Sequence, residues 1–341
     1  MATFFVSPKN KFMKVQHIIG ADLSKRSIDL VYHLSKAYIK IDNSINGFND
    51  LMQWLQKLNI NTSETMIVME HTGLYSYCFE SFLHQHQIAF CKVNALEIKR
   101  SIGLVRGKTD KLDAARIAEY GYEKRDRLTV DQPVSNGLKR LQVLHSTYQR
   151  LVRHRAALIN ALKEYKHIGI TEKDLVIQTQ RQLIKNFDKH IQKLMSEIEM
   201  VINQQPALKQ NFLLLQSIKG VGKILALTVI IKTHNFTRFI NARKFACFCG
   251  TAPFDHSSGT SIRMKPRVSH LADKQMKTLL DLSAKSAIQY DKELKEYYLK
   301  RTQNGKSKMS TINVVRNKIL YRMFAVVKRQ TPFTENHSQA A

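Results

Sequence analysis

Two long stretches of helical periodicity constrain the fold of this chain more than any other feature of its sequence. From Leu138 to Tyr165 apolar residues recur every three or four positions, and the same spacing returns from Ile184 to Val201. Such a stripe covers one face of an α-helix, and a short break near 167–171 separates the two stretches. The pattern predicts two long helices packed as an antiparallel hairpin, with the apolar stripe as a core or a dimer seam.

The segment before the hairpin alternates between strand and helix patterns. Short apolar runs bounded by turn residues indicate strands, and apolar residues at helical spacing indicate helices. The predicted strands are 15–21, 27–34, 37–41, 65–69 and 88–93, and the predicted helices are 46–58, 75–86 and 110–124. The second and third strands are close enough in sequence for a meander, and Thr109 is the expected N-cap of the last helix. This alternation predicts an α/β domain.

The region after Pro206 is again mostly helical in pattern. Helices are predicted at 276–298 and 311–327, and a loop at 250–259. The changes of pattern divide the chain into an α/β domain at 1–128, a helical hairpin at 129–208, a mostly helical domain at 209–330 and a flexible tail at 331–341.

The balance of charge indicates the kind of partner. The chain has 54 Lys and Arg but only 27 Asp and Glu, a formal net charge of +27. So large an excess favours a polyanionic partner, with nucleic acid as the first hypothesis and an anionic membrane surface as the second. No apolar run reaches the length of about 18 residues that suggests a membrane span, and the first residues lack the apolar core of a signal peptide. We therefore expect the protein to stay in the cytoplasm, where its positive charge would favour association with the nucleoid.

Four carboxylates lie at the ends of predicted strands and at the start of a predicted helix. Asp22 and Glu70 each follow an apolar strand, and Asp110 and Asp113 lie one turn apart on one helical face. Taken singly, they have ordinary interpretations. Asp22 could be a turn or cap residue, and the two helix acids could favour the helix N-terminus and face water. Together they predict one acidic site.

An acidic set of this kind has a specific chemical use. Phosphoryl transfer between DNA strands uses metal ions about 3.5–4 Å apart, flanked by carboxylates, and the hard oxygens of Asp and Glu suit Mg²⁺. Mg²⁺, or Mn²⁺ in its place, is therefore the predicted cofactor. Basic residues that would hold a DNA backbone accompany the helix acids: Lys99, Arg100, Arg106, Lys108 and Lys111.

A second group of candidate residues lies on a basic stretch without acids between Asp255 and Asp273. A serine hydroxyl attacks phosphate only when a base or a metal activates it, and the sequence offers no certain base, although His256 is near. From spacing alone, a turn or a phosphate-binding loop is the favoured interpretation. The residues concerned are Ser257, Ser258, Arg263, Lys265 and Arg267.

The Gly-Val-Gly segment at 220–222 is similar to the tip of a helix–hairpin–helix motif. Gly220 and Gly222 allow backbone N–H groups to point outward, and the N-terminus of the next helix, at Lys223, adds its dipole. Such a tip binds a DNA phosphate without reading the base sequence.

These motifs, in this order, resemble those of the DEDD insertion-sequence transposases, a family that includes a pilin-gene invertase and the bridge-RNA-guided recombinases. The resemblance rests on GADLSK, MEHTG and TDKLDAARIA, followed downstream by IKGVGKILA and GTAPFDHSSG. It covers roughly residues 14–325. The TDxxDA pattern after an acid-ended strand is its most specific element.

The resemblance implies a RuvC-like, ribonuclease-H-type N-terminal domain, a coiled-coil hairpin and a C-terminal transposase domain that carries a serine nucleophile. It implies an enzyme that cuts and rejoins donor and target DNA, a homo-oligomer (dimer or tetramer) and a structured guide RNA. Ser258 matches the family's serine, with Ser257 as the alternative. The residues that match the metal-binding set are Asp22, Glu70, Asp110 and Asp113.

Two other functions stay open at this point. A RuvC-like junction resolvase would cut with metal-activated water and never use Ser258. A non-catalytic nucleic-acid-binding protein would keep only the fold and the charge. The segment after Ser258 also contains less glycine around Ala272 and Asp273 than the family pattern, so the DNA contacts of residues 262–277 are left open.

Overall fold

The structure is a computed structural model that describes residues 15–101, 103, 107, 109–258, 262–269 and 271–334. For residues 166, 255–258 and 262–265 it describes the backbone alone. The chain divides into two compact units, Met1–Val134 and Ser135–Ala341. The predicted domain limits at 128, 208 and 330 stay predictions.

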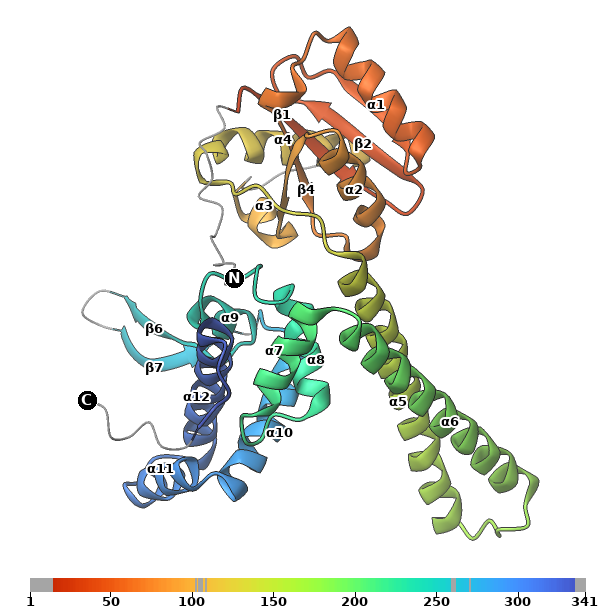
Figure 1. The fold of residues 1–341 in the computed structure, drawn as a ribbon, viewed down its shortest axis with the longest axis vertical. Helices are drawn as coiled ribbons and strands as arrows, with labels where there is room; N and C mark the ends of the chain where they lie inside the picture. Colours follow the sequence, from red (N-terminus) through yellow and green to blue (C-terminus); the bar gives the residue numbers. More distant parts are fainter. Residues whose placement is uncertain are drawn as a thin grey trace. The chain divides into compact units, whose positions relative to one another are not determined.

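A five-stranded mixed sheet forms the centre of the first unit (Figure 1). β1, β2 and β3 form an antiparallel meander, whereas β4 runs parallel to β1 and β5 runs parallel to β4. All five predicted strands and the meander are confirmed. In sheet order the strands are β3 (Tyr38–Asp42), β2 (Ser27–Tyr32), β1 (His17–Leu23), β4 (Thr65–Glu70) and β5 (Ala89–Val93).

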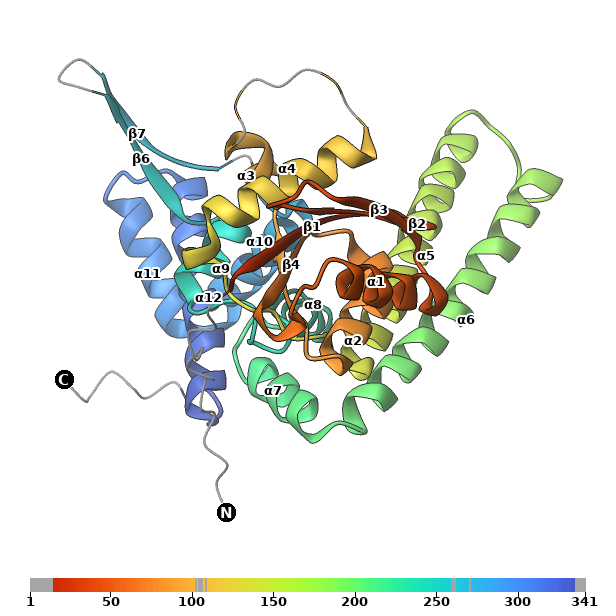
Figure 2. The same ribbon diagram turned by 90° about the horizontal axis from the view of Figure 1, so that it is seen from above.

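Helices cover both faces of this sheet (Figure 2). On one face, α1 (Ile45–Lys57) and α2 (Tyr77–Gln85) bury Phe48 and Phe79 against the strands. On the other face lies α4 (Asp110–Glu123), where the small residues Ala114 and Ala118 are fully buried. The predicted mixed α/β architecture is confirmed. The short elements of this unit are α3 (Ala95–Ser101) and the 3-10 turns η1 (Thr62–Glu64), η2 (Gly73–Ser76) and η3 (Arg125–Arg127).

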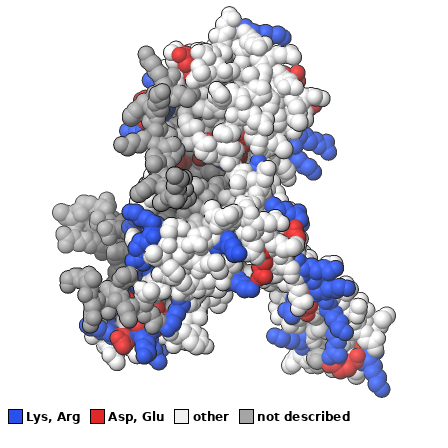
Figure 3. Space-filling view, viewed as in Figure 1, with Lys and Arg blue, Asp and Glu red and all other residues white. Residues whose placement is uncertain are grey.

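Two long helices, α5 (Asn136–His167) and α6 (Leu175–Asn203), lie side by side at the start of the second unit (Figure 1). Arg155 pairs with Asp188 at 2.5 Å and Arg140 with Glu197 at 3.1 Å, so the two helices run antiparallel. The predicted helical hairpin is therefore confirmed. Lys and Arg side chains gather along its surface (Figure 3). Coiled-coil packing and a dimer seam stay predictions.

The remainder of the second unit consists of short helices and one β-hairpin. Strands β6 (Pro253–Ser258) and β7 (Ile262–Val268) pair antiparallel. The helices are α7 (Pro206–Gln216), α8 (Lys223–Thr233), α9 (Ala242–Phe248), α10 (Lys274–Tyr290), α11 (Lys292–Gln303) and α12 (Lys308–Arg329). No helix in the part of the chain described here combines the length and the apolar character needed to cross a membrane.

Two local predictions are wrong in this unit. The predicted loop at 250–259 is in part a strand, because β6 pairs its backbone with β7 although its sequence lacks a regular apolar alternation. The predicted single helix at 276–298 is two helices that meet at Asp291. Its backbone is extended (φ −103°, ψ 115°), and its carboxylate caps α11 by accepting a hydrogen bond from the Leu294 N–H at 2.9 Å.

Candidate functional site

The alternation of side chains along β1 decides which residues face α4. Ile19 and Ala21 belong to the core under α1 and α2, whereas Ile18 belongs to a core on the opposite face. Because successive strand residues face opposite sides of a sheet, Gly20 and Asp22 share the α4 face.

A row of charged residues crosses this face. Asp22 of β1 pairs in register with Asp29 of β2, and Asp29 pairs with Lys40 of β3. On the other side of β1, Glu70 ends the parallel strand β4, one residue beyond Met69, which pairs with Ala21. Strand pairing therefore places Lys40, Asp29, Asp22 and Glu70 across four neighbouring strands.

Helix α4 brings two further carboxylates to the same face. Thr109 is its N-cap, as predicted, and accepts a hydrogen bond from the Leu112 N–H at 3.2 Å. Asp110 begins the helix with 67% of its side chain exposed, whereas the Asp113 side chain is 27% exposed. Arg116 holds Asp113 through an ion pair at 2.8 Å. The helix start is thus acidic and faces the row on the sheet.

The electrostatics of Asp22 indicate that these carboxylates act on one another. The pKa of Asp22 is raised from 3.8 to about 6, first by burial of the side chain and then by the negative charges of Glu70, Asp113, Asp110 and Asp29, in that order. All three other members of the predicted set are therefore close enough to Asp22 to disfavour its ionised form. The sequence-predicted carboxylates form one acidic cluster.

The cluster is not a closed ligand cage as it stands. Among the residues that the structure describes, no three His, Cys, Asp or Glu side chains are arranged so that they could hold one metal ion. The donors nevertheless fit a hard divalent cation in kind, because all are carboxylate oxygens. A cation would also relieve the repulsion that raises the pKa of Asp22. Metal binding by Asp22, Glu70, Asp110 and Asp113 stays a prediction.

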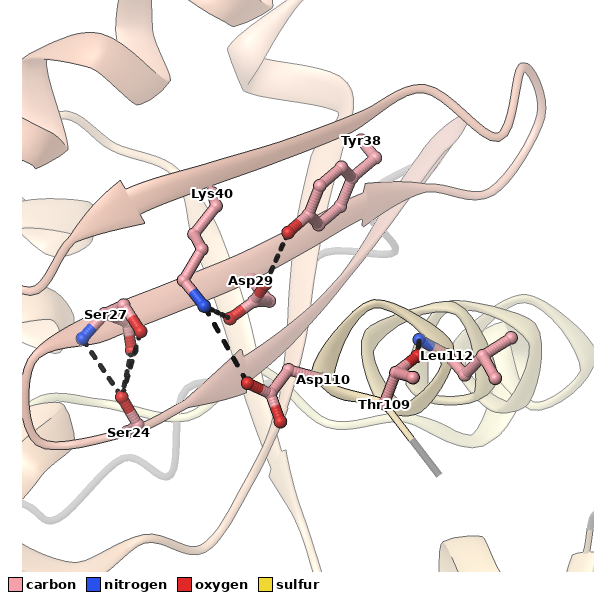
Figure 4. Close-up of polar contacts among 8 residues, drawn as sticks. All are labelled: Ser24, Ser27, Asp29, Tyr38, Lys40, Thr109, Asp110 and Leu112. Carbon is pink, nitrogen blue, oxygen red and sulfur yellow. Dashed lines mark hydrogen bonds and ion pairs between the residues drawn. The ribbon is translucent and has the colours of Figure 1, made fainter. Parts of the chain in front are cut away.

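Sequence reasoning missed three residues of this face, which Figure 4 shows together. Asp29 is a buried carboxylate that accepts a hydrogen bond from the Tyr38 hydroxyl at 2.6 Å. The Lys40 ammonium lies 3.5 Å from Asp29 and 3.8 Å from Asp110. The strand register could have identified them in advance. Each of the three residues occupies a position on the α4 face, either beside Asp22 or on the next strand of the charged row.

Of the two predicted nucleic-acid contacts in the first unit, Lys108 and Lys111, the structure describes only Lys111. Lys111 is exposed on α4, and its ammonium lies over the Tyr38 ring, 5.0 Å from the centroid. Lys108 lies outside the described residues.

The Gly-Val-Gly turn in the second unit joins α7 to α8. Gly220 has a positive φ of 87°, and an added Cβ would lie 2.6 Å from the carbonyl oxygen of Ser283 in α10. Packing therefore explains this glycine. Gly222, in contrast, is exposed at the N-terminus of α8 with open space around it, and the neighbouring Lys223 pairs with Glu199 at 2.6 Å. Of the two glycines, only Gly222 offers a free approach to a phosphate.

The second group of candidate residues, which contains the two serines, lies on the β6–β7 hairpin. Ser258 ends β6, and its backbone pairs in register with Ile262 of β7. The side chains of Ser257, Ser258, Arg263 and Lys265 are outside the described part of the structure, whereas Arg267 is exposed on β7. The roles of these residues stay predictions.

Two sequence models of known families match separate parts of the chain. A model for the DEDD transposase of IS110, described as Transposase, matches residues 19–165, which contain all four predicted carboxylates. A model described as Transposase IS116/IS110/IS902 family matches residues 213–299, which contain the glycine turn and Ser258. Together the two matches cover more than half of the chain. The chain belongs to the IS110 family of transposases.

Individual relatives of this IS110-family transposase agree with that assignment. The chain is 28% identical to the pilin gene-inverting protein of Moraxella bovis over 324 aligned residues. This alignment covers 92% of this chain and 97% of that protein. The Moraxella lacunata protein of the same name matches equally well. Identity to the transposase for insertion sequence element IS1111A of Coxiella burnetii is 24% over 255 residues, 66% of this chain and 68% of that protein. The predicted family and enzyme class, a DNA transposase or recombinase, are confirmed.

In this transposase the close contact of β1 with α4 depends on Gly20. A Cβ at this position would lie 2.2 Å from both the Ala114 carbonyl oxygen and the Ala118 amide nitrogen, which are backbone atoms of α4. We predict that Gly20→Ala displaces the helix that carries Asp110 and Asp113. The free energy of unfolding should fall by about 2–3 kcal/mol, as for other overpacked cores, with a loss of recombination. Calorimetry and a plasmid recombination assay measure the two effects.

Gly121→Ala is the matched control for this prediction. Its added Cβ would meet side-chain carbons of Val68 and Ile18 at 2.7 and 2.9 Å rather than backbone atoms, and alanine favours the helix over glycine. We expect a smaller loss of stability than for Gly20→Ala. Equal stability of Gly20→Ala and the wild type would show that α4 does not depend on this contact.

Proposed function

We propose that this transposase cuts and rejoins donor and target DNA by metal-assisted phosphoryl transfer in a RuvC-like first unit. Ser258 would be the covalent nucleophile, and a structured RNA the guide. The observation that carries the proposal is the acidic cluster around Asp22, where burial and then the negative charges of Glu70, Asp113 and Asp110 raise the pKa of that carboxyl to about 6. Carboxylates that repel one another at the ends of strands are a recurrent feature of sites that bind divalent cations.

The proposed chemistry assigns Mg²⁺ or Mn²⁺ to the four carboxylates. When bound, the cation would polarise the scissile phosphate and stabilise the attacking and leaving oxygens. Asp22 and Glu70 would contribute from the ends of paired strands, and Asp110 and Asp113 from the first turn of α4. The mixed sheet with its antiparallel meander supports the RuvC-like assignment.

The proposed partners are DNA, a guide RNA and further copies of the chain. Support for nucleic acid comes from the net charge of +27 and from exposed predicted contacts at Lys111, Gly222 and Arg267. A homodimer or homotetramer follows from the resemblance to the family, and the nucleoid of a bacterial cytoplasm is the expected place of action. Family membership argues against the non-catalytic hypothesis. A junction resolvase, in contrast, would cut DNA without using Ser258.

Recombination between a donor and a target plasmid tests the proposal. Purified protein should form recombinant junctions only with Mg²⁺ or Mn²⁺ and with RNA transcribed from the non-coding DNA beside its gene. A chelator should reduce the junctions to background, and excess Mg²⁺ should restore them. Junctions are counted by sequencing across the joined ends.

Recombination that persists when one component is removed from that assay would contradict the part of the proposal that depends on this component. Full recombination without RNA would remove the guide, and full recombination in the presence of a chelator would remove the metal. Cleavage of branched DNA without joining would favour the junction resolvase. An RNA of scrambled sequence and equal length is the control for non-specific effects of a polyanion.

A further inference from the structure

Asp29 has no role in the proposed four-carboxylate set, yet it lies beside it. Its side chain is only 4% exposed, and it pairs in register with Asp22. Burial of a carboxylate is costly unless it is paired and hydrogen-bonded. Two groups meet that need here, the Tyr38 hydroxyl at 2.6 Å and the Lys40 ammonium at 3.5 Å. A buried acid maintained beside an acidic cluster requires an explanation.

The position of Lys40 provides one. Its ammonium lies between a sheet carboxylate, Asp29, and a helix carboxylate, Asp110, as Figure 4 shows. The two contacts are unequal. Asp29 is buried, is 3.5 Å from the ammonium and is held by Tyr38, whereas Asp110 is two-thirds exposed and 3.8 Å away. The contact with Asp29 is therefore the anchor, and the contact with Asp110 is the weaker of the two.

Tyr38 keeps this anchor in place. Its hydroxyl donates to Asp29, and this hydrogen bond, with burial and the charges of Asp29 and Asp110, raises the pKa of Tyr38 to about 12. The hydroxyl therefore stays protonated and continues to donate. Lys111 lies over the ring of the same tyrosine, 5.0 Å from its centroid, in the geometry of a cation–π contact.

We infer that Lys40 is a built-in counter-ion of the acidic cluster, anchored on Asp29 and Tyr38, which neutralises Asp110 in the metal-free protein and releases it to an incoming divalent cation. The inference rests on the proposed metal site. Like charges at the cluster need a counter-charge before metal binds, and Lys40 pairs with Asp110 as Arg116 pairs with Asp113. Once Asp110 turns to the metal, Lys40 remains on Asp29. Its positive charge then opposes the metal and limits metal affinity.

Mn²⁺ binding to the full chain, measured by calorimetry and by electron paramagnetic resonance of the free ion, tests this role. Lys40→Met should bind Mn²⁺ more tightly by roughly three- to tenfold, because a unit positive charge near the ion is lost. Its melting temperature without metal should fall, and Mn²⁺ should raise it by more than in the wild type. Lys40→Arg, which keeps the charge, should bind Mn²⁺ within about twofold of the wild type.

Lys57→Met is the matched control, because Lys57 is exposed at the end of α1 on the opposite face of the sheet. It removes the same charge and should leave Mn²⁺ affinity unchanged. Unchanged or weaker binding by Lys40→Met overturns the counter-ion role, and weaker binding would instead make Lys40 a residue that positions Asp110. A wild type that does not bind Mn²⁺ at all overturns the proposed metal site, and the role of Lys40 with it.

Discussion

Replacement of Asp22 by Asn is expected to abolish strand transfer and, at the same time, to raise the thermal stability of the metal-free protein. Asp22 lies where burial and four neighbouring carboxylates disfavour its charge. Loss of one member of a metal set removes several kcal/mol of transition-state stabilisation, and about 4 kcal/mol corresponds to roughly a thousandfold in rate. Recombinant yield measures the first effect and calorimetry with a chelator the second.

The stability gain follows from the direction of the pKa change. The folded protein holds the Asp22 proton with a pKa of about 6 against an ordinary value of 3.8, so it binds that proton more tightly than the unfolded chain does. The stability of the wild type therefore falls as the pH rises from about 4 to about 6. Asparagine does not ionise, so the Asp22→Asn variant does not lose stability over this pH range. Its melting temperature should exceed that of the wild type above pH 6 and equal it below pH 4.

Asp50→Asn serves as the control, because Asp50 is an exposed acid of α1 on the opposite face of the sheet. It should change neither recombination nor stability appreciably. Strand transfer that survives Asp22→Asn would exclude Asp22 from the catalytic set. A variant less stable than the wild type at every pH would assign the residue a structural role.

The acidic cluster could be predicted in part from the sequence, because its four members stand at strand ends and in one helical turn. Asp22 and Glu70 follow apolar runs, and the spacing of Asp110 and Asp113 places them on one helical face. Asp29 could not be found in the same way. In SIDLVY it has the appearance of an ordinary polar residue on an alternating strand. Only the register with Asp22 and the cover provided by α4 show that it is buried beside the site.

Long-range contacts account for the other differences between prediction and structure. The sequence around Gly220 predicts a phosphate-binding tip, but the structure explains this glycine by its contact with Ser283 in α10, which no local pattern contains. The break at Asp291 depends in the same way on Arg322 of α12, which pairs with its carboxylate at 2.6 Å. Local periodicity predicts an element and its face, but not the distant residue that ends it or packs on it.

Replacement of Ser258 by Ala is expected to abolish strand joining and the covalent protein–DNA adduct. In the proposed step the serine oxygen forms a bond to phosphorus while a P–O bond of the DNA breaks, and the released DNA oxygen takes up a proton. Attack by a hydroxyl of the second DNA strand then reverses the exchange and frees the serine. Deletion of a nucleophile should slow joining by on the order of 10⁴-fold or more. Denaturing electrophoresis of labelled donor DNA detects the adduct.

Ser257→Ala separates the two interpretations of this hairpin. Ser257 and Ser258 are adjacent in β6, and Ser258 is the residue that matches the serine of the family. Ser257→Ala should therefore keep both the adduct and joining. If Ser257→Ala loses the adduct and Ser258→Ala keeps it, the nucleophile is Ser257. If both variants still cut DNA in a metal-dependent reaction without an adduct, water is the nucleophile, and the protein uses the acidic cluster as a junction resolvase would.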